Sequence, residues 1–238
     1  MTTARILSWD IEASNLSADF GVVLTVGFTY VDSPEVEVLR IDDYGKDILK
    51  AEKAMLKDVS KRLMAADIWL THFGTWYDIN FINSRLLYHR LPVIAPNHPH
   101  IDTWKIAKNR LKLRNNRLVT ISEFLKTGEE KNSIRPEQWL YALGLKKSAI
   151  DYIVEHCRRD VVVLKEVYLL IRPLITNHPH MGFERPEECP VCGKGPLVIS
   201  KHRRTRTRFY TQFQCKNCGS YSTDTKSGSK RPRMVVSG

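Results

Sequence analysis

The chain has 238 residues, 42% apolar and 26% charged, a balance typical of a globular protein with one full core and room for a small second module. No stretch reaches the roughly 18–20 consecutive apolar residues of a membrane span, and the start of the chain lacks the apolar region and cleavage site of a signal peptide. We therefore expect a cytoplasmic protein without a membrane partner.

The net charge of +11 favours a polyanionic partner such as nucleic acid. Residues 183–238 contain 12 Lys and Arg against 4 Asp and Glu, whereas residues 1–182 contain 25 against 22. Most of the excess charge thus lies in the last quarter of the chain. A basic tail that only aids solubility is the alternative interpretation.

The predicted elements begin with strands and continue with strands and helices in alternation. Apolar, β-forming runs separated by short polar gaps predict an antiparallel meander at residues 4–12, 21–31 and 35–42. Apolar residues at helical spacing, a short apolar run and a second helical pattern then predict a helix, a strand and a helix at residues 47–65, 68–72 and 78–89.

The second half of the chain predicts a short strand at 100–105, a basic stretch ending near Arg117, and helices at 120–126, 133–142 and 148–171. Strands in front, followed by alternating strands and helices, indicate an α/β fold with a mixed sheet flanked by helices. We divide the chain into a main domain, a linker, a cysteine-containing module and a flexible basic tail, at residues 1–175, 176–186, 187–225 and 226–238.

Two acids, Asp10 and Glu12, lie inside the first predicted strand. Side chains alternate along a strand, so the two carboxylates share one face, close enough for one metal ion to bridge them. Two carboxylates held together repel each other unless a proton or a cation intervenes, and Mg²⁺ or Mn²⁺ suits oxygen ligands. The alternative is an edge strand whose acids face water.

Two further places combine acids with a structural context. Asp78 opens a predicted helix directly after a strand and a glycine-containing turn, where an Asp is often only a helix cap. His156 and Asp160 are four residues apart in the strongest helical pattern and so share one helical face. The alternative for that pair is a surface contact between the flanking arginines.

Taken in order, these motifs resemble those of the DEDD superfamily of 3′–5′ exonucleases, which have a ribonuclease-H-like fold. Asp10-Ile11-Glu12 is similar to the D-x-E motif on the first strand, and Phe73-Gly74-Thr75-Trp76-Tyr77-Asp78 is similar to N-G-x-x-F-D. Asp160 corresponds to the acid of the Tyr-x-x-x-Asp motif. The resemblance covers roughly residues 4–172.

The sequence departs from the family pattern at two positions. Phe73 stands where family members often have Asn, and His156 stands where one subclass has Tyr. The histidine subclass places its His one position earlier, where this chain has Glu155. His156 is then a working base in a shifted register, a water-orienting replacement for Tyr, or a sign of an impaired site, and we favour a working group.

The resemblance implies a metal-dependent 3′–5′ exonuclease that hydrolyses terminal phosphodiesters of single-stranded nucleic acid, with DNA favoured over RNA. Asp10, Glu12, Asp78 and Asp160 would hold two Mg²⁺ or Mn²⁺ ions about 4 Å apart, and His156 would take the proton of the attacking water. A polymerase or another replication protein is a candidate partner. Near these motifs, we expect the aromatic side chains to belong to the core rather than to stack on bases: Trp9, Phe20, Trp76 and Tyr77.

The carboxy-terminal region contains two CxxC pairs, each followed by glycine and separated by 22 residues: Cys189, Cys192, Cys215 and Cys218. In a chain without a secretory signal, this spacing favours a closed tetrahedral Zn²⁺ site over disulfides. Strands predicted at 196–200 and 209–213 make the module resemble a zinc ribbon. An iron site of the rubredoxin type is the alternative.

The predicted hairpin between the CxxC pairs is strongly basic. Alternation along a strand would place Arg204, Arg206 and Arg208 on one face, which indicates sequence-independent contacts to phosphates. The nucleic-acid-binding set that we predict is Lys201, Arg203, Arg204, Arg206 and Arg208. A hairpin that docks another protein is the competing interpretation.

Two other functions stay open at this point. One is a non-catalytic nucleic-acid-binding adaptor built on a degenerate nuclease fold, which the departures at Phe73 and His156 keep in view. The other is an endonuclease with the same metal chemistry. The sequence contains nothing that marks a reader of the RNA 2′-hydroxyl.

Overall fold

The computed structural model describes residues 4–95, 97–128, 134–181, 188–204 and 209–223, without the side chains of Arg203, Arg204 and Phe209. The chain divides into two compact units. One unit is Arg5–Ile171, and the other combines Met1–Ala4 with Arg172–Gly238.

The first unit is built on a mixed five-stranded sheet of order β3-β2-β1-β4-β5. The pairs β1–β2 and β2–β3 are antiparallel, which confirms the predicted meander, whereas β1–β4 and β4–β5 are parallel. The strands are β1 (Ile6–Ala13), β2 (Val23–Tyr30), β3 (Glu37–Arg40), β4 (Ile68–Thr71) and β5 (His100–Asp102). A 3₁₀ turn, Ile41–Tyr44, follows β3.

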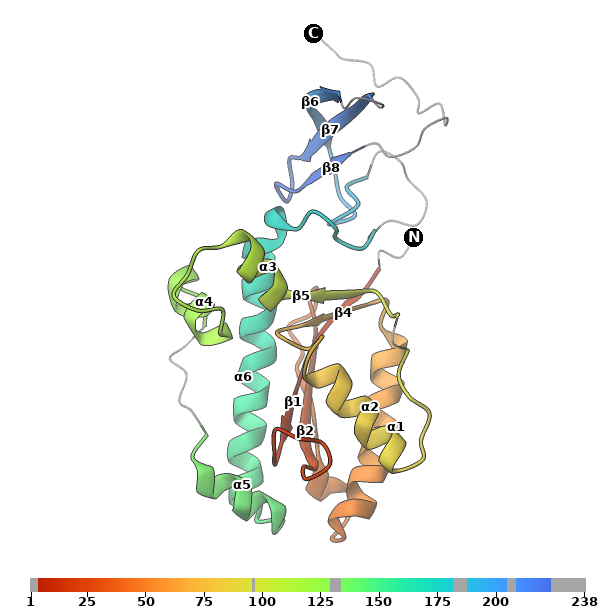
Figure 1. Cartoon of the computed structure of the whole chain (residues 1–238), viewed down its shortest axis with the longest axis vertical. Coiled ribbons are helices and arrows are strands. Elements are labelled where there is room, and N and C mark those ends of the chain that lie inside the picture. The colour runs from red at the N-terminus through yellow and green to blue at the C-terminus, as the bar shows by residue number, and fades with distance from the viewer. Residues whose placement is uncertain (1–3, 96, 129–133, 182–187, 205–208, 224–238) are drawn as a thin grey trace. The chain divides into compact units, whose positions relative to one another are not determined.

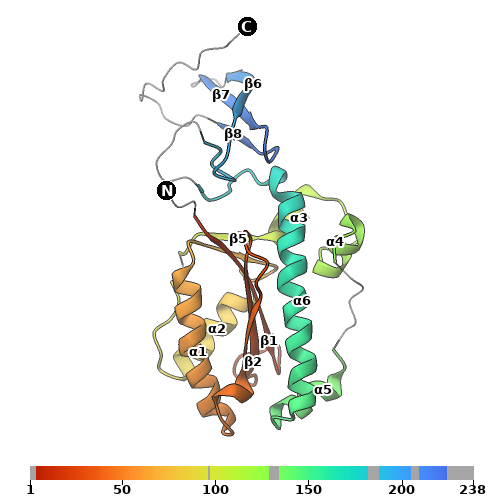
Figure 2. The same cartoon turned by 180° about the vertical axis from the view of Figure 1, so that it is seen from behind.

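Helices cover both faces of this sheet (Figures 1 and 2). On one face lie α1 (Ile48–Ala65) and α2 (Asp78–Tyr88). The other face is crossed by α6 (Lys147–Ile171), against which pack α3 (Thr103–Arg110), α4 (Leu118–Leu125) and α5 (Pro136–Leu143). The expected α/β fold with a mixed sheet is confirmed. None of the described helices is both long and apolar enough to cross a bilayer.

The prediction of a strand over 100–105 is wrong beyond Asp102, where α3 begins. The carboxylate of Asp102 accepts the backbone N–H of Trp104 and so caps that helix. The predicted helix over 133–142 starts instead with Pro136 in its first turn, a position that suits the fixed φ of proline.

A glycine allows α6 to lie close to the sheet. Gly27 on β2 faces the helix, and a Cβ atom there would lie 3.0 Å from Cys157 Sγ and 3.1 Å from Val161 Cγ1. The Cys157 thiol lies 3.7 Å from the carbonyl oxygen of Asp10, to which it can donate. Since Gly27 is paired with Asp10 across the β1–β2 ladder, this close approach occurs beside the acids of β1.

A buried ion-pair cluster joins α1 to α2. Glu52 is fully buried and accepts from Arg85 Nε at 2.9 Å, from His89 Nε2 at 2.7 Å and from the backbone N–H of Val23 at 2.9 Å. A buried charge is costly without such partners, so these contacts fix α2 relative to β2.

The second unit contains an antiparallel three-stranded sheet of order β6-β7-β8. Its strands are β6 (Leu197–Arg204), β7 (Phe209–Cys215) and the short β8 (Tyr221–Thr223), which the sequence pattern did not predict. Leu197 and Phe213 pack with the cysteines to form the small buried core of this unit.

Candidate functional site

The acids of β1 lie where that strand extends past its parallel neighbour. Ladder pairing between β1 and β4 covers Ile6–Ser8, and β4 ends at Thr71. Beyond this point one edge of β1 is open. Asp10 and Glu12 are both half-buried there, on one face of the strand, while Ile11 between them is buried on the other.

Asp78, the first residue of α2, fills the open edge. Its Oδ1 accepts the backbone N–H of Ile11 at 3.2 Å, and the residue is only 3% exposed. Burial raises the pKa of Asp78 to about 7, against the Ile11 hydrogen bond, which lowers it, and with a smaller raising contribution from the Asp102 charge. The residue therefore does more than cap a helix, since it bonds to a strand 67 residues away in sequence.

The turn that leads into Asp78 is held by hydrogen bonds to Asp102, a residue that the sequence patterns did not single out. Asp102, at the end of β5, accepts the N–H of Phe73 at 2.9 Å and of Thr75 at 3.1 Å. Gly74 in this turn has no substitute with a side chain, because a Cβ atom would lie 2.2 Å from Thr71 Oγ1. The one available signal was that parallel strands bring their carboxyl ends to one edge of a sheet.

The helix α6 supplies the remaining groups. His156 Nε2 lies 3.6 Å from Glu12 Oε1 and 3.8 Å from Asp160 Oδ2. One ligand atom from each of Glu12, His156 and Asp160 lies within 4.8 Å of the others, a grouping that could hold a metal ion. Asp160 is buried, so the pair is not the surface contact that the sequence left open.

Asp10 and Asp78 lie outside that group of three, but their charges act on the same neighbours. Burial raises the pKa of the Tyr77 hydroxyl, and the charges of Asp78, Glu12 and Asp10 raise it further. Burial likewise raises the pKa of the Cys157 thiol, with contributions from Asp10, Glu12 and Asp160. The four predicted carboxylates therefore lie around one region, and carboxylate oxygens with one imidazole are a donor set that Mg²⁺ or Mn²⁺ accepts.

The expectation for the nearby aromatic residues is correct for Trp9 and Tyr77 and wrong for Phe20 and Trp76. Tyr77 is half-buried and packs against the core. Trp9 is fully buried in the core, packed edge-on against Trp69. Phe20 and Trp76 are instead 80% and 61% exposed. Both lie on turns rather than in the strand interior, so no neighbouring layer covers them.

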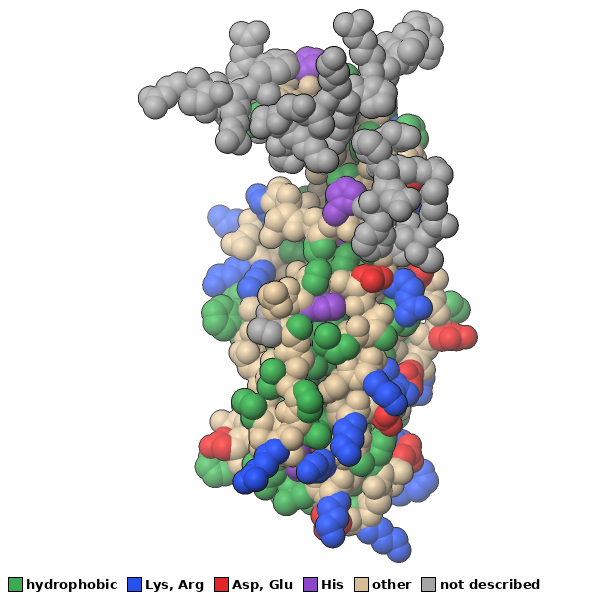
Figure 3. Space-filling model, turned by 90° about the vertical axis from the view of Figure 1, so that its right-hand side faces the viewer, with side chains coloured by type: hydrophobic (Ala, Val, Ile, Leu, Met, Phe, Trp, Pro, Cys, Tyr) green, Lys and Arg blue, Asp and Glu red, His purple; other side chains and the backbone are tan. Residues whose placement is uncertain are grey.

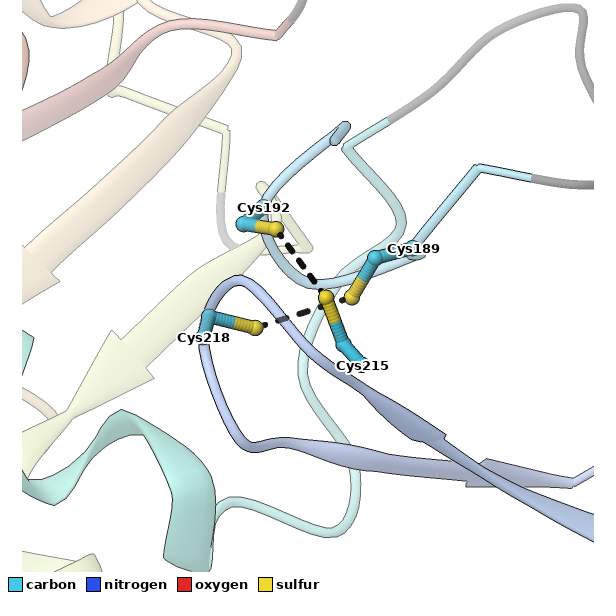
Figure 4. A group of neighbouring side chains, drawn as sticks. All are labelled: Cys189, Cys192, Cys215 and Cys218. Atoms are coloured by element: carbon cyan, nitrogen blue, oxygen red, sulfur yellow. Dashed lines mark hydrogen bonds between the residues drawn. The ribbon is translucent and has the colours of Figure 1, made fainter. Parts of the chain in front are cut away.

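The four cysteines of the second unit converge (Figure 4). The Sγ atoms of Cys189 and Cys218 are 3.7 Å apart, and those of Cys192 and Cys215 are 3.8 Å apart. Tetrahedral zinc with Zn–S bonds of about 2.3 Å requires sulfur separations close to these values, whereas a disulfide requires about 2.05 Å. The cluster is compatible with a zinc ribbon.

The CxxC turns have the hydrogen bonds of metal-binding knuckles. Gly193 and Gly219 have positive φ, and their N–H groups donate to the carbonyls of Cys189 and Cys215. The N–H of Val191 donates to Cys189 Sγ. Burial disfavours ionisation of the Cys218 thiol, but hydrogen bonds from Ser220 outweigh it and lower the pKa to about 7.

The predicted basic surface of the hairpin is only partly described. Lys201 is exposed on β6, and β6 continues through Arg203 and Arg204, four residues beyond the predicted strand end at 200. Arg206 and Arg208 lie outside the described residues, as do the side chains of Arg203 and Arg204. The shared face of alternating arginines stays a prediction.

Comparisons with known proteins agree with this fold. A family model of the RNase H superfamily matches residues 7–171, which is more than half of the chain. No curated protein matches the chain. The fold is similar to a solved structure of the family B DNA polymerase from the hyperthermophilic archaeon Pyrobaculum calidifontis, with a TM-score of 0.53 and 12% sequence identity.

That likeness covers 84% of this chain but only 32% of the polymerase, and at this identity it shows a shared fold alone. The family match supports a nuclease-type hydrolase in general terms. On the extent of that match, and on the mixed sheet with acids on its first strand, the chain belongs to the RNase H superfamily.

Proposed function

We propose that the chain is a metal-dependent 3′–5′ exonuclease of the DEDD type, which hydrolyses the terminal phosphodiester of single-stranded nucleic acid, with DNA favoured over RNA. The observation that carries this proposal is the convergence of Glu12, His156 and Asp160 within 4.8 Å. Asp10 on the same face of β1 and Asp78 on the Ile11 amide complete the set of acids.

Asp10, Glu12, Asp78 and Asp160 would hold the divalent cations. Two such ions, when bound, supply activation of the attacking water and neutralisation of charge on the phosphate and the leaving oxygen. His156 presents Nε2 between Glu12 and Asp160, where it accepts the proton that the water loses. Asp102 keeps the turn before Asp78 in place, so that the acid enters the site from a fixed backbone.

In the second unit, the proposal assigns one structural Zn²⁺ to Cys189, Cys192, Cys215 and Cys218 as the centre of a zinc ribbon. A unit with so small a core would depend on the metal for its folding. The basic hairpin would contact phosphates through Lys201, Arg203, Arg204, Arg206 and Arg208. A cytoplasmic role beside a polymerase or another replication protein fits these properties.

The test is hydrolysis of end-labelled DNA and RNA strands of matched sequence, with the 3′ or the 5′ end blocked, in Mg²⁺ or Mn²⁺. We expect stepwise shortening from a free 3′ end, loss of this activity in Asp10→Ala, and full activity in Asp43→Ala, a control acid exposed on the turn after β3. Cleavage of a circular strand would assign an endonuclease instead. If the wild type hydrolyses neither strand but binds both, the proposal fails in favour of a non-catalytic adaptor.

A further inference from the structure

The positive charge of the nuclease unit is concentrated in one short segment. Residues 103–122 contain six Lys and Arg and no Asp or Glu, although residues 1–182 as a whole contain 25 basic and 22 acidic residues. All six basic side chains are exposed, on α3 and the loop that follows it: Lys105, Lys108, Arg110, Lys112, Arg114 and Arg117. The rest of residues 1–182 contains 19 basic and 22 acidic residues, so this segment accounts for the net positive charge of the region.

Aromatic residues lie among these cations: Phe73 and Trp76 are exposed, and Trp104 is half-buried. Lys105 Nζ lies 5.7 Å from the centre of the Trp76 ring, and Lys108 Nζ lies 4.8 Å from that of Trp104. Phe73 packs edge-on against Trp104 at a centroid distance of 5.1 Å. The described rings and cations of Phe73, Trp76 and α3 thus form one surface, which we name the aromatic–basic surface.

Phe73 is held there against its backbone preference. Its φ of 69° is in the left-handed region, which costs a residue with a Cβ roughly 1–2 kcal/mol, yet the residue is 39% exposed rather than buried. The partial burial of this ring against Trp104 gives little stability in return for the backbone strain. Strain of this kind is concentrated at functional positions.

The aromatic–basic surface is connected to the acid site through the backbone. Phe73 and Trp76 belong to the turn that runs directly into Asp78, and Asp102 binds the amides of that turn and caps α3. The same carboxylate therefore fixes both the acid and the surface beside it.

We propose that the aromatic–basic surface binds the nucleic-acid strand on its way to the acid site, with Trp76 stacking on an unpaired base and Lys105 and Lys108 contacting phosphates. Cations alone would fit any polyanion, but an aromatic face presented beside them fits nucleobases. Bases inside a duplex are already stacked on both faces, so the bases of a single strand are the ones free to stack along its length. The inference rests on the proposed function and deepens it, because it names the residues beside the acid site that bind the single strand and the contact that each makes.

The test measures binding apart from hydrolysis. Zinc-loaded full-length protein is titrated into a fluorescent oligothymidine of 20 nucleotides and, separately, into a labelled duplex, both without magnesium or manganese. Fluorescence anisotropy gives the affinity at several salt concentrations. The variants are Trp76→Ala, Trp76→Phe and the pair Lys105→Ala/Lys108→Ala. The matched control is Lys53→Ala/Lys57→Ala, two exposed lysines on α1. On the face that α1 and α2 cover, acidic and basic side chains are mixed (Figure 3).

We expect Trp76→Ala to weaken single-strand binding about tenfold, within the range for loss of one stacked base, and Trp76→Phe to recover most of it. Duplex affinity should not change in Trp76→Ala. On single strands, Lys105→Ala/Lys108→Ala should reduce the magnitude of the negative slope of log affinity against log salt by about 1.4, at about 0.7 per lost phosphate contact. The control pair should leave the slope unchanged.

Three results would overturn the inference: unchanged single-strand affinity in Trp76→Ala, an equal loss of salt slope in the control pair, or displacement of the strand by polyglutamate as effective as by unlabelled oligothymidine. The outcome is separable from that of the proposed function. Hydrolysis with none of these binding differences refutes the surface alone, whereas the binding differences without hydrolysis refute the exonuclease and leave the surface.

Discussion

Replacing Asp78 by asparagine should stabilise the metal-free protein at neutral and higher pH while abolishing hydrolysis. Burial raises the pKa of this carboxyl from its ordinary value of 3.8 to about 7. Between these values the folded protein holds a proton that the unfolded chain has lost, so stability falls as pH rises through this window. Each pKa unit corresponds to about 1.4 kcal/mol, so the full penalty above pH 7 is about 4 kcal/mol.

Asparagine keeps an oxygen for the Ile11 N–H and carries no charge, so it escapes the penalty. Relative to wild type, the free energy of unfolding of Asp78→Asn should rise by about 3 kcal/mol between pH 5 and pH 8. Urea titration followed by tryptophan fluorescence measures this unit alone, because all five tryptophans lie in Arg5–Ile171. The exposed Asp43→Asn should show no such change, and equal differences at pH 5 and pH 8 for Asp78→Asn would refute the reasoning.

Three further predictions concern the proposed base, the turn before Asp78 and the cysteines. His156→Ala should lower kcat about 10²- to 10⁴-fold, the usual contribution of a positioned base, with little change in KM, and steady-state kinetics that show unchanged kcat would remove His156 from the mechanism. Asp102→Asn should lower the free energy of unfolding by about 1–3 kcal/mol, because the amide nitrogen of asparagine cannot accept a hydrogen bond and one backbone N–H loses its partner. A thermal melt measures this loss, and an unaltered Tm with full activity would contradict the role of Asp102. Metal analysis should find one zinc per chain in wild type and none in Cys192→Ser. Visible absorption of an iron–thiolate centre would instead establish the alternative metal.

The sequence patterns could predict what depends on periodicity. The alternation of a strand places Asp10 and Glu12 on one face, and the i, i+4 spacing places His156 beside Asp160. The meander followed from strand length and short gaps. These features are local, so they are visible in the order of residues.

What escaped prediction depends on contacts between distant parts of the chain. Asp102 accepts hydrogen bonds from amides 27 and 29 residues away, so the sequence around it does not indicate this role. The exposure of Trp76 was missed because its hydrophobicity suggests a core, whereas its place on a tight turn decides the outcome. The strand predicted over 100–105 was cut short by the same Asp102, whose capping bond favours a helix.

The absence of a side chain at Gly27 determines how closely the sheet and α6, the helix that carries His156 and Asp160, can approach each other. An added methyl group there would meet both the thiol and the backbone carbonyl of Cys157 at 3.0–3.2 Å, and only a few tenths of an ångström of give would relieve the contact. A larger residue would push α6 away from the sheet and move His156 and Asp160 away from Glu12. The distance between Glu12 and the groups on α6 therefore depends on Gly27, a residue that carries no functional group.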